Sequence, residues 1–278
     1  MPVLSPDIAA STKELQRSFW SAEACGETPY GVGDTLRDRL EAQAKTRYEL
    51  EPYLPLFARF EDGHDKDVLE VGVGMGADHL QWALAKPRSL TGVDLTERGI
   101  GLTRERLALY ALQSNLQVAD AENLPFADNS FDLVYSWGVV QHTPDTDRAI
   151  QELHRVLRPG GIARVMIYHR RSLVGFMLWG RYALLAGRPW RSLDEIYANY
   201  LQGPGTKAYS LDEGRHLFRA FHHVTARPQL SFGDLLEGAV GQRHDGPLLR
   251  IAKRVFPRTL VRTLFPHTGL YLLLEGKK

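Results

Sequence analysis

The chain has 278 residues, and 44% of them are hydrophobic and 24% are charged, which is typical of a folded globular protein rather than a disordered, collagen-like or coiled-coil chain. With 34 lysines and arginines against 33 aspartates and glutamates, the net charge of +1 provides no overall positive field for binding nucleic acid. This length favours one large domain, or one domain that carries a lid.

Residues 1–60 are predicted to form a helical N-terminal extension or cap, and residues 61–278 the main domain. Asp34 or Thr35 is suited to cap a helix that runs to residue 50, because each has a side-chain oxygen that can accept a backbone hydrogen bond. Pro52 and Pro55 are expected to close this helical segment. The preceding residues 25–34 are rich in glycine and are predicted to be a loop.

From residue 67 onward, short apolar segments alternate with segments of helical spacing. Strands are predicted over residues 67–71, 89–95, 116–120, 131–137 and 163–169, and helices over residues 77–85, 96–112 and 144–157. The last of these helices is expected to have Thr143 as its N-cap and Pro144 at its first position, and to end in a turn over residues 158–161. The alternation predicts a doubly wound, mainly parallel α/β sheet with helices on both faces.

The C-terminal part carries a helix start and two further strands. Ser210 and Glu213 have the spacing of a capping box, so a helix should begin there, followed by a strand over residues 222–232. Residues 269–276 form the last predicted strand. Apart from residues 248–265, no segment of crossover length precedes it, so we expect it to run antiparallel to its predecessor, as a reversed edge strand.

The turn after the first strand has the strongest chemical signal. It carries one acidic residue and three glycines, namely Glu70, Gly72, Gly74 and Gly76. Positions without side chains let a ligand approach the backbone, and ligands of open α/β sheets bind beyond the carboxyl ends of the strands. Asp94 follows 22 positions after Gly72, at the end of the second strand, where its carboxylate could accept hydrogen bonds from a ribose. The loop alone leaves both NAD and another nucleoside cofactor open.

Five sequence pieces in order resemble the class I S-adenosylmethionine-dependent methyltransferases. They are EVGVGMG, Asp94, residues 120–122 before LPF, FDLVYSWGVVQHTPD and LHRVLRPGG. The resemblance covers residues 67–169 and, more loosely, the C-terminal strands. It implies a Rossmann-like fold and S-adenosylmethionine as the cofactor instead of NAD, with S-adenosylhomocysteine as the product.

The resemblance also implies a role for each matching residue. Glu70 would organise the loop near the methionine part, the three glycines would admit the cofactor, and Asp94, followed by Leu95, would hold the ribose hydroxyls. The adenine would face Asp120 and Ala121, and the methionine amino group and sulfonium would lie near Ser136 and Trp137. The alternatives are that Asp94 is a turn residue, Asp120 a loop cap and Trp137 part of the core or lid.

Three residues are candidates for catalysis. His142 follows the fourth strand on the side where the methyl group must be delivered, and an imidazole can take a proton near neutral pH. The alternative, which we slightly prefer, is a structural histidine that caps the next helix. Tyr168 and His169 end the fifth strand and compete for the same role. The remaining histidines lack metal-ligand spacing, so no metal is predicted.

Residues 172–209 interrupt the α/β pattern and are predicted to be a substrate lid. Leu173 and residues 176–179 would give an apolar wall, and six cationic residues would add positive charge: Arg170, Arg171, Arg181, Arg188, Arg191 and Lys207. An acceptor with an apolar body and an anionic group would match this composition. The alternative is that the aromatic side chains are core and the cations are solvated.

We therefore expect methyl transfer from S-adenosylmethionine to oxygen or carbon of a small-molecule acceptor. An NAD-linked oxidoreductase and an inactive cofactor-binding scaffold are the alternatives. Nucleic acid is disfavoured as the acceptor by the net charge and because SWGV stands at residues 136–139, where related enzymes that methylate amino groups have an Asn-Pro-Pro-Tyr type of motif.

The remaining features concern the cell compartment and the membrane. Cys25 is the single cysteine, which excludes an intramolecular disulfide and fits a reducing cytoplasm, and the N-terminal segment lacks the pattern of a secretory signal. The basic residues 248–265 could touch an anionic membrane surface, but a packed pair of helices broken at Pro257 is favoured. The sequence does not indicate an oligomeric state.

Overall fold

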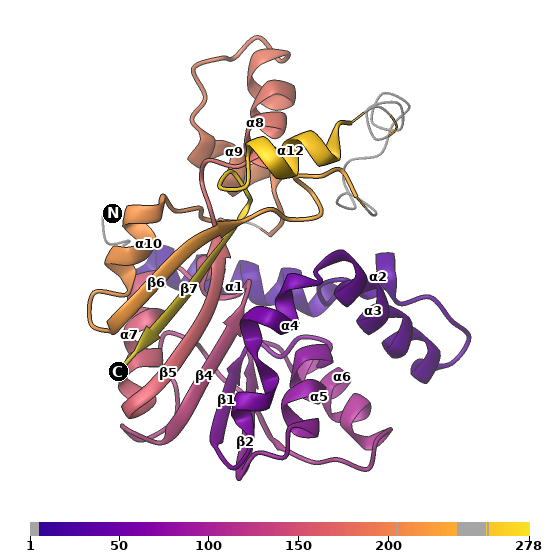
Figure 1. The fold of residues 1–278 in the computed structure, drawn as a ribbon, viewed down its shortest axis with the longest axis vertical. Helices are drawn as coiled ribbons and strands as arrows, with labels where there is room; N and C mark the ends of the chain where they lie inside the picture. Colours follow the sequence, from indigo (N-terminus) through magenta and orange to yellow (C-terminus); the bar gives the residue numbers. More distant parts are fainter. Residues whose placement is uncertain (1–5, 204, 238–253, 255) are drawn as a thin grey trace.

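The computed structural model describes residues 6–203, 205–237, 254 and 256–278. Its centre is a seven-stranded sheet in the order β3-β2-β1-β4-β5-β7-β6 (Figure 1). Neighbouring strands from β3 to β5 are parallel, which confirms the predicted doubly wound α/β fold. The strands are β1 (Asp67–Val71), β2 (Ser89–Asp94), β3 (Asn115–Val118), β4 (Phe131–Trp137), β5 (Leu157–Tyr168), β6 (His222–Gln229) and β7 (Tyr271–Lys277).

Helices cover both faces of this sheet. Leu69 and Val71 of β1 pack with α7 and α10 on one face, whereas Val68 packs with α4, α5 and α6 on the other. This alternation follows from the two-residue period of a strand, and it buries β1 on both faces. These elements are α4 (Tyr53–Ala58), α5 (Ala77–Leu84), α6 (Glu97–Ala108), α7 (Thr146–Val156) and α10 (Leu211–Leu217), with 3-10 turns η1 (Phe60–Gly63) and η2 (Val140–His142).

The last strand runs antiparallel, as predicted, but it does not lie at the edge. β7 is inserted between β5 and β6 and pairs antiparallel with both, so β6 is the edge strand. The burial of the two strands explains this order. Four consecutive residues of β7, from Tyr271 to Leu274, are buried, which suits an interior strand, whereas most residues of β6 are exposed or half-buried.

The N-terminal helices differ from the prediction in two places. The helix expected after residue 35 is α3 (Leu36–Leu50), and Thr35 caps it through a capping box with Asp38. Pro52 and Pro55 do not close the helical segment, because Pro52 is the N-cap of α4 and Pro55 lies inside that helix. Proline is tolerated there because the first turn of a helix has no internal partner for its N–H groups. The expected loop also contains a short helix, α2 (Glu27–Tyr30).

The segment between β4 and β5 needs two corrections. Asp145, and not Thr143, is the N-cap of α7, and its side chain accepts a hydrogen bond from the backbone N–H of Arg148. Residues 158–161 are not a separate turn, because β5 already begins at Leu157, opposite Phe131. Arg158 holds this first part of the strand through ion pairs with Asp67 and Asp132.

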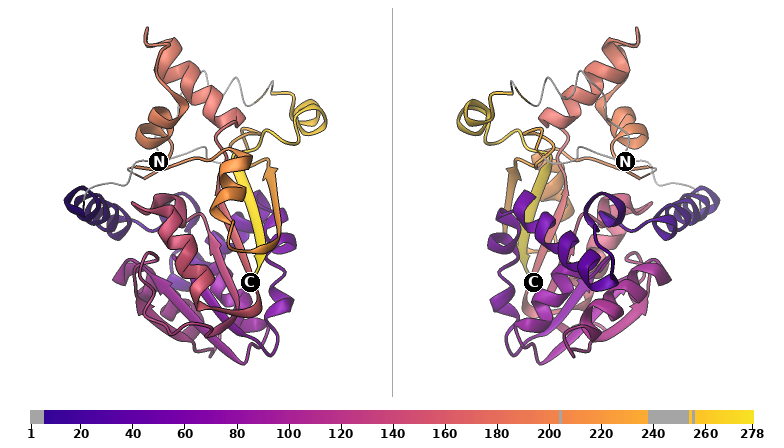
Figure 2. Two further views of the ribbon diagram at one scale, coloured as in Figure 1. Left: turned by 90° about the vertical axis from the view of Figure 1, so that its left-hand side faces the viewer. Right: turned by 90° about the vertical axis from the view of Figure 1, so that its right-hand side faces the viewer.

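Two groups of helices lie beyond the carboxyl ends of the parallel strands (Figures 1 and 2). The N-terminal group is α1 (Pro6–Ala22), α2 and α3. The insertion after β5, residues 172–209, forms α8 (Leu173–Trp179), the π-helix η3 (Gly180–Leu184) and α9 (Leu193–Tyr200), next to α12 (Arg258–Leu264). α12 begins directly after Pro257, where a break was predicted; residues 248–253 and 255 lie outside the described residues. Within the described part of the chain, no helix is long and apolar enough to span a membrane.

Candidate functional site

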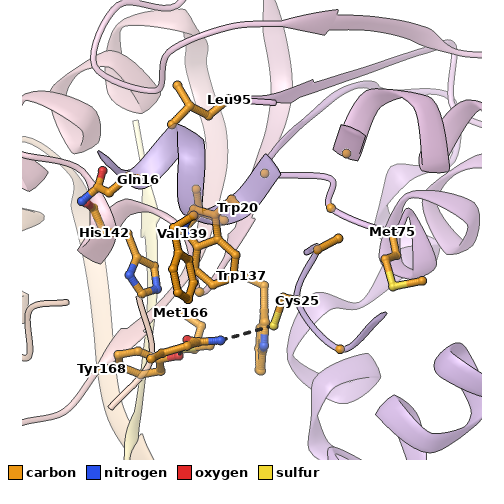
Figure 3. A pocket seen from close by; sticks show the side chains of 18 of the residues that line it. Gln16, Trp20, Cys25, Met75, Leu95, Trp137, Val139, His142, Met166 and Tyr168 are labelled. Carbon is orange, nitrogen blue, oxygen red and sulfur yellow. Dashed lines mark hydrogen bonds between the residues drawn. The ribbon is translucent and has the colours of Figure 1, made fainter. Parts of the chain in front are cut away.

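A cavity of about 1260 Å³ lies between the carboxyl ends of the strands and these two groups of helices (Figure 3). Its floor consists of the loops that follow β1, β2, β3 and β4. One wall comes from α1 and α3, and the other from α8, η3 and the residues around Leu270. The sheet edge chosen from the sequence therefore opens into a real cavity, and the N-terminal extension closes part of it.

The glycine loop shapes the floor of the cavity. Gly72 and Gly74 have φ angles of 86° and 52°, in the left-handed region that favours glycine. A Cβ at Gly72 would lie 2.1 Å from Cγ2 of Val139, so only glycine fits there. A Cβ at Gly74 would meet nothing within 4 Å, so this backbone faces open space. Gly76 is not among the lining residues; it allows α6 to approach the loop, because a Cβ there would lie 2.9 Å from Thr103.

Glu70 is a buried carboxylate at the end of β1. Its Oε2 lies 2.9 Å from Nδ1 of His79, and Nε2 of that histidine lies 2.8 Å from Oγ of Ser114. Burial raises the pKa of Glu70 well above its ordinary value, and burial lowers the pKa of His79 to about 3. A neutral imidazole therefore fixes the orientation of the carboxylate that borders the cavity.

Asp94 is held at the end of β2 by three hydrogen bonds. One of its carboxylate oxygens accepts from the backbone N–H of Gly74 at 3.0 Å, and the other from the N–H and hydroxyl of Thr96 at 2.9 and 2.8 Å. Both Asp94 and Leu95 line the cavity. A carboxylate has about four acceptor positions, so about one position remains on Asp94, on the oxygen that Gly74 contacts, for a hydroxyl group of a ligand.

Lys13 of α1 reaches Asp120 at the end of β3. The Lys13 ammonium lies 2.5 Å from the Asp120 carboxylate and 2.7 Å from that of Glu122. Asp120 and Ala121 line the cavity, as does Lys13. Sequence reasoning missed Lys13, because a lone lysine on an N-terminal helix has no signal of its own.

The two residues at the end of β4 lie differently. Ser136 is fully buried and does not line the cavity; its hydroxyl donates to the carbonyl of Val71 at 3.0 Å and ties β4 to β1. Trp137 lines the cavity and also packs against the core, with its ring centroid 6.4 Å from that of Tyr53 and 5.7 Å from that of Tyr271. Trp137 thus both borders the cavity and packs in the core, so the two positions that the sequence left open for it are both observed.

His142 and Tyr168 border the cavity, whereas His169 does not. Nδ1 of His142 lies 3.2 Å from the hydroxyl of Thr206, and its buried Nε2 has no hydrogen-bond partner. Burial, with the nearby Lys207 cation, lowers the pKa of His142 to about 4. The alternative that His142 caps the next helix is wrong, since Asp145 does so. His169 has its Nδ1 3.1 Å from the carbonyl of Gly269 instead.

Figure 3 shows residues of the N-terminal extension and residues that follow β4 and β5 around the same cavity. His142 and Trp20 lie side by side with ring centroids 5.4 Å apart, and the ring of Tyr168 is 5.9 Å from His142. The amide of Gln202 accepts from the Tyr168 hydroxyl and donates to the sulfur of Cys25 at 3.3 Å. The end of the insertion therefore contacts the N-terminal extension across the cavity.

The insertion contributes fewer cavity residues than its composition suggested. Of the predicted apolar wall, Met177 and Leu178 line the cavity, whereas Leu173, Phe176 and Trp179 do not. The other lining residues of the insertion are Val174, Arg181, Leu201 and Gln202. Three of the six expected cations are engaged elsewhere: Arg170 pairs with Asp194 and Glu213, Arg191 pairs with Glu195, and Lys207 donates to the carbonyls of Thr143 and Pro144. Of these six expected cations, Arg181 of η3 lines the cavity. In the described residues, no cluster of histidine, cysteine and acidic side chains could hold a metal ion.

Comparison with known proteins agrees with this geometry. Residues 69–165 match the model of a methyltransferase domain family. The chain is 46% identical over 147 residues to the phthiotriol/phenolphthiotriol dimycocerosates methyltransferase of Mycobacterium tuberculosis, covering 51% of this chain and 52% of that one. It is 36% identical over 104 residues to the ubiquinone/menaquinone biosynthesis C-methyltransferase UbiE of Geotalea daltonii, covering 36% and 43%. The chain thus spans about half the length of the curated relatives it matches.

Solved structures share the fold. Phosphoethanolamine N-methyltransferase 2 of Haemonchus contortus, solved with S-adenosylhomocysteine, superposes with a TM-score of 0.57 at 18% identity, over 88% of this chain and 60% of that one. A putative methyltransferase from Haloferax volcanii, in complex with its activator Trm112, gives a TM-score of 0.54 at 20% identity, over 87% and 97%. The matching methyltransferase domain and the methyltransferase relatives decide between the two cofactors in favour of S-adenosylmethionine. Residues 69–165 therefore form a methyltransferase domain of the class I, S-adenosylmethionine-dependent type.

Proposed function

We propose that this protein transfers the methyl group of S-adenosylmethionine to oxygen or carbon of a small-molecule acceptor with an apolar body. The observation that carries the proposal is the size and lining of the cavity. A cavity of about 1260 Å³ exceeds the roughly 300–1,000 Å³ of a pocket for one small molecule, so a cofactor and an acceptor fit together.

The cofactor would occupy the part of the cavity above β1, β2 and β3. Asp94, next to Leu95, would accept hydrogen bonds from the ribose hydroxyls, and Asp120 with the Ala121 backbone would face the adenine. Glu70 would lie near the cationic methionine part, where its buried carboxylate gains from an opposite charge. Gly72 and Gly74 would let the cofactor lie against the backbone, while Gly76 and Ser136 shape the loop and the strand end from behind.

The acceptor would occupy the part above β4 and β5, under the insertion. Trp137, Met166 and Tyr168 form the floor there, and Met177 and Leu178 of α8 lie opposite. This apolar lining suits an apolar acceptor, and Arg181 at its border could pair with an anionic group. The names of the two relatives, a quinone-biosynthesis C-methyltransferase and a dimycocerosates methyltransferase, support an acceptor of this kind.

The reaction asks the chain mainly to position its two ligands. The cofactor supplies an electrophilic methyl group bound to a sulfonium. When the methyl group is transferred, the sulfur leaves as a neutral thioether. Trp20 and His142 close the cavity from the side of α1, and the insertion closes it from above, so these two elements would act as a lid that excludes water. His142 and Tyr168 would contact the acceptor there.

Calorimetry tests the cofactor part of this proposal. We expect the purified chain to bind S-adenosylhomocysteine and to show no heat with NAD. Incubation with methyl-labelled S-adenosylmethionine and a mixture of apolar phenols and quinols should then transfer label to the organic phase. Binding of NAD without binding of S-adenosylhomocysteine would contradict the assignment.

A further inference from the structure

A buried carboxylate outside the motif segments borders the acceptor part of the cavity. Glu51 is the C-cap residue of α3, and its side chain is only 5% exposed. Its Oε1 accepts a hydrogen bond of 2.6 Å from the hydroxyl of Tyr271. Its Oε2 has no hydrogen-bond partner. An unsatisfied carboxylate oxygen at a cavity wall is costly, so it points to a ligand with a hydrogen to donate.

The nearby cation does not satisfy this oxygen. Nη1 of Arg47 lies 3.5 Å from Glu51 Oε2 but forms no hydrogen bond with it. The same guanidinium donates from Nε and Nη2 to the carboxylate of Asp78, at 3.0 and 2.7 Å. Arg47 is therefore held by Asp78, and it compensates part of the charge of Glu51 while leaving Oε2 free to accept.

Glu51 lies at the end of the cavity that the cofactor would not fill. Tyr271 begins β7 and pairs in register with Tyr168, the last residue of β5. The Tyr271 ring centroid is 5.7 Å from that of Trp137 and 6.2 Å from that of Tyr168. Because β5 and β7 are three and four strand positions from β2, Tyr168 and Tyr271 lie about 14 and 19 Å across the sheet from Asp94.

We propose that Glu51, positioned by the hydrogen bond from Tyr271, holds the reacting hydroxyl of the methyl acceptor, and that Oε2 of Glu51 takes its proton. The inference rests on the proposed function and narrows it to a hydroxyl compound with an apolar body, such as a phenol. The acceptor oxygen would sit against Glu51 and the rings of Trp137 and Tyr271, and its apolar body would extend toward α8.

The step balances without a further reactant. A lone pair of the acceptor oxygen forms the new O–CH₃ bond as the C–S bond breaks, and that bonding pair stays on sulfur, giving S-adenosylhomocysteine. The O–H proton passes to Glu51, which changes from a carboxylate to a neutral acid. One positive and one negative charge disappear together, which a water-excluded cavity favours.

The surroundings of Glu51 suit a base. Burial raises the pKa of the Glu51 carboxyl, partly offset by Arg47 and by the hydrogen bond from Tyr271. The other titratable groups that face it are Asp78 of α5, Tyr53 of α4, Tyr30 of α2, Tyr168 of β5 and Cys25. All four tyrosines that face it, Tyr271 included, have a raised pKa, so they stay neutral where Glu51 titrates.

The variant Glu51→Gln tests this role, with Glu49→Gln as the matched control. Glu49 lies on the same helix with a side chain that is 64% exposed. The probes are 4-nonylphenol and 4-nonylanisole, which differ only in the hydroxyl hydrogen. In the presence of S-adenosylhomocysteine, we expect the parent and Glu49→Gln to bind the phenol at least tenfold more tightly than the anisole. In Glu51→Gln this preference should fall below threefold, with the affinity for S-adenosylhomocysteine within twofold of the parent.

Turnover provides the second readout. With S-adenosylmethionine, the parent should convert 4-nonylphenol to 4-nonylanisole, and Glu51→Gln should be slower by about 10²–10⁴-fold. The parent rate should fall as the pH drops through the raised pKa of Glu51, and the residual rate of Glu51→Gln should lack this limb. Tyr271→Phe keeps the ring and should weaken phenol binding by about three- to tenfold.

Each contrary outcome is informative. A loss of S-adenosylhomocysteine affinity of more than tenfold in Glu51→Gln would place Glu51 in the cofactor site and overturn this inference. So would a parent that binds S-adenosylhomocysteine but does not bind the phenol or does not distinguish it from the anisole. A parent that does not bind S-adenosylhomocysteine would overturn the proposed function, and this inference with it. Comparison of melting temperatures separates these effects from a loss of folded protein.

Discussion

The Lys13 ammonium lies 2.5 Å from the carboxylate of Asp120, although 107 residues separate the two in the chain. This ion pair attaches α1 to the end of β3, and Gln16, one turn later, donates to the backbone carbonyl of His142 at the end of η2. α1 is therefore attached at two points that both line the cavity.

Replacing Lys13 should loosen this attachment. In Lys13→Met we expect faster proteolytic cleavage of residues 6–22 and an affinity for S-adenosylhomocysteine lower by about two- to fivefold, since a partly exposed ion pair is worth roughly 0.2–1 kcal/mol. Arg17→Met is the control, because the Arg17 side chain is 49% exposed and its ion pair with Glu14 stays within α1. Equal cleavage rates in the two variants would show that Lys13 does not hold α1.

Asp94→Asn should weaken cofactor binding without unfolding the chain. The amide keeps the size of the carboxylate, but its NH2 group cannot accept a hydrogen bond and the negative charge is lost. A hydrogen bond from the ribose to a charged carboxylate is worth about 1.5–3 kcal/mol. We therefore expect the calorimetric affinity for S-adenosylhomocysteine to fall about 10- to 150-fold. Asp212→Asn, at a side chain that is 92% exposed, should bind like the parent. Unchanged affinity in Asp94→Asn would rule out the ribose assignment.

Limited proteolysis should show whether residues 172–209 act as a lid. Leu185 and Trp190 are 84% and 77% exposed, and they lie between η3 and α9, so we expect cleavage near them in the free protein. A cofactor and an acceptor that fill the cavity should protect this segment, because Met177, Leu178 and Arg181 border it. Cleavage at the same rate in all ligation states would argue that the insertion is a fixed part of the fold.

The stability of the chain should depend on His142 in mildly acidic solution. Its folded pKa of about 4 lies below the ordinary value of 6.5, so between these pH values the unfolded chain binds a proton that the folded chain does not. The free energy of unfolding should therefore fall as the pH drops from about 6.5 to 4, by at most about 1.4 kcal/mol per pH unit. Urea unfolding of His142→Gln, in which the other histidines remain, should show a correspondingly shallower dependence. Parallel curves for the two proteins would contradict this.

The same variant separates two candidates for the base. If Glu51 takes the proton, His142→Gln should retain turnover within about fivefold of the parent, because a histidine with a pKa near 4 is a weak base. A loss of 10²–10⁴-fold in the folded enzyme would instead give that role to His142. Turnover and melting temperature should be measured on the same preparation.

The alternation of strands and helices could be predicted from the sequence because it is a local pattern. The period of apolar residues in β1 and β4, and the glycines that follow β1, depend only on neighbours within one element. The sequence-based predictions were wrong where two nearby residues could each play the same structural role. Thr143 and Asp145 both carry a suitable oxygen, and in the structure Asp145 is the N-cap of α7. The position of β7 inside the sheet is set by the burial of Tyr271 to Leu274 between β5 and β6.

The sequence by itself determined the class of fold and the places of the glycine loop and of Asp94 at the edge of the sheet, because Glu70, the glycines and Asp94 follow strand ends at short range. Only the tertiary structure decided what closes the cavity and which distant residues border it. Lys13 meets Asp120 and Glu51 meets Tyr271 across 107 and 220 residues, respectively. No periodicity links such residues, because the contacts form only when α1, α3 and β7 pack at the carboxyl ends of β1 to β5.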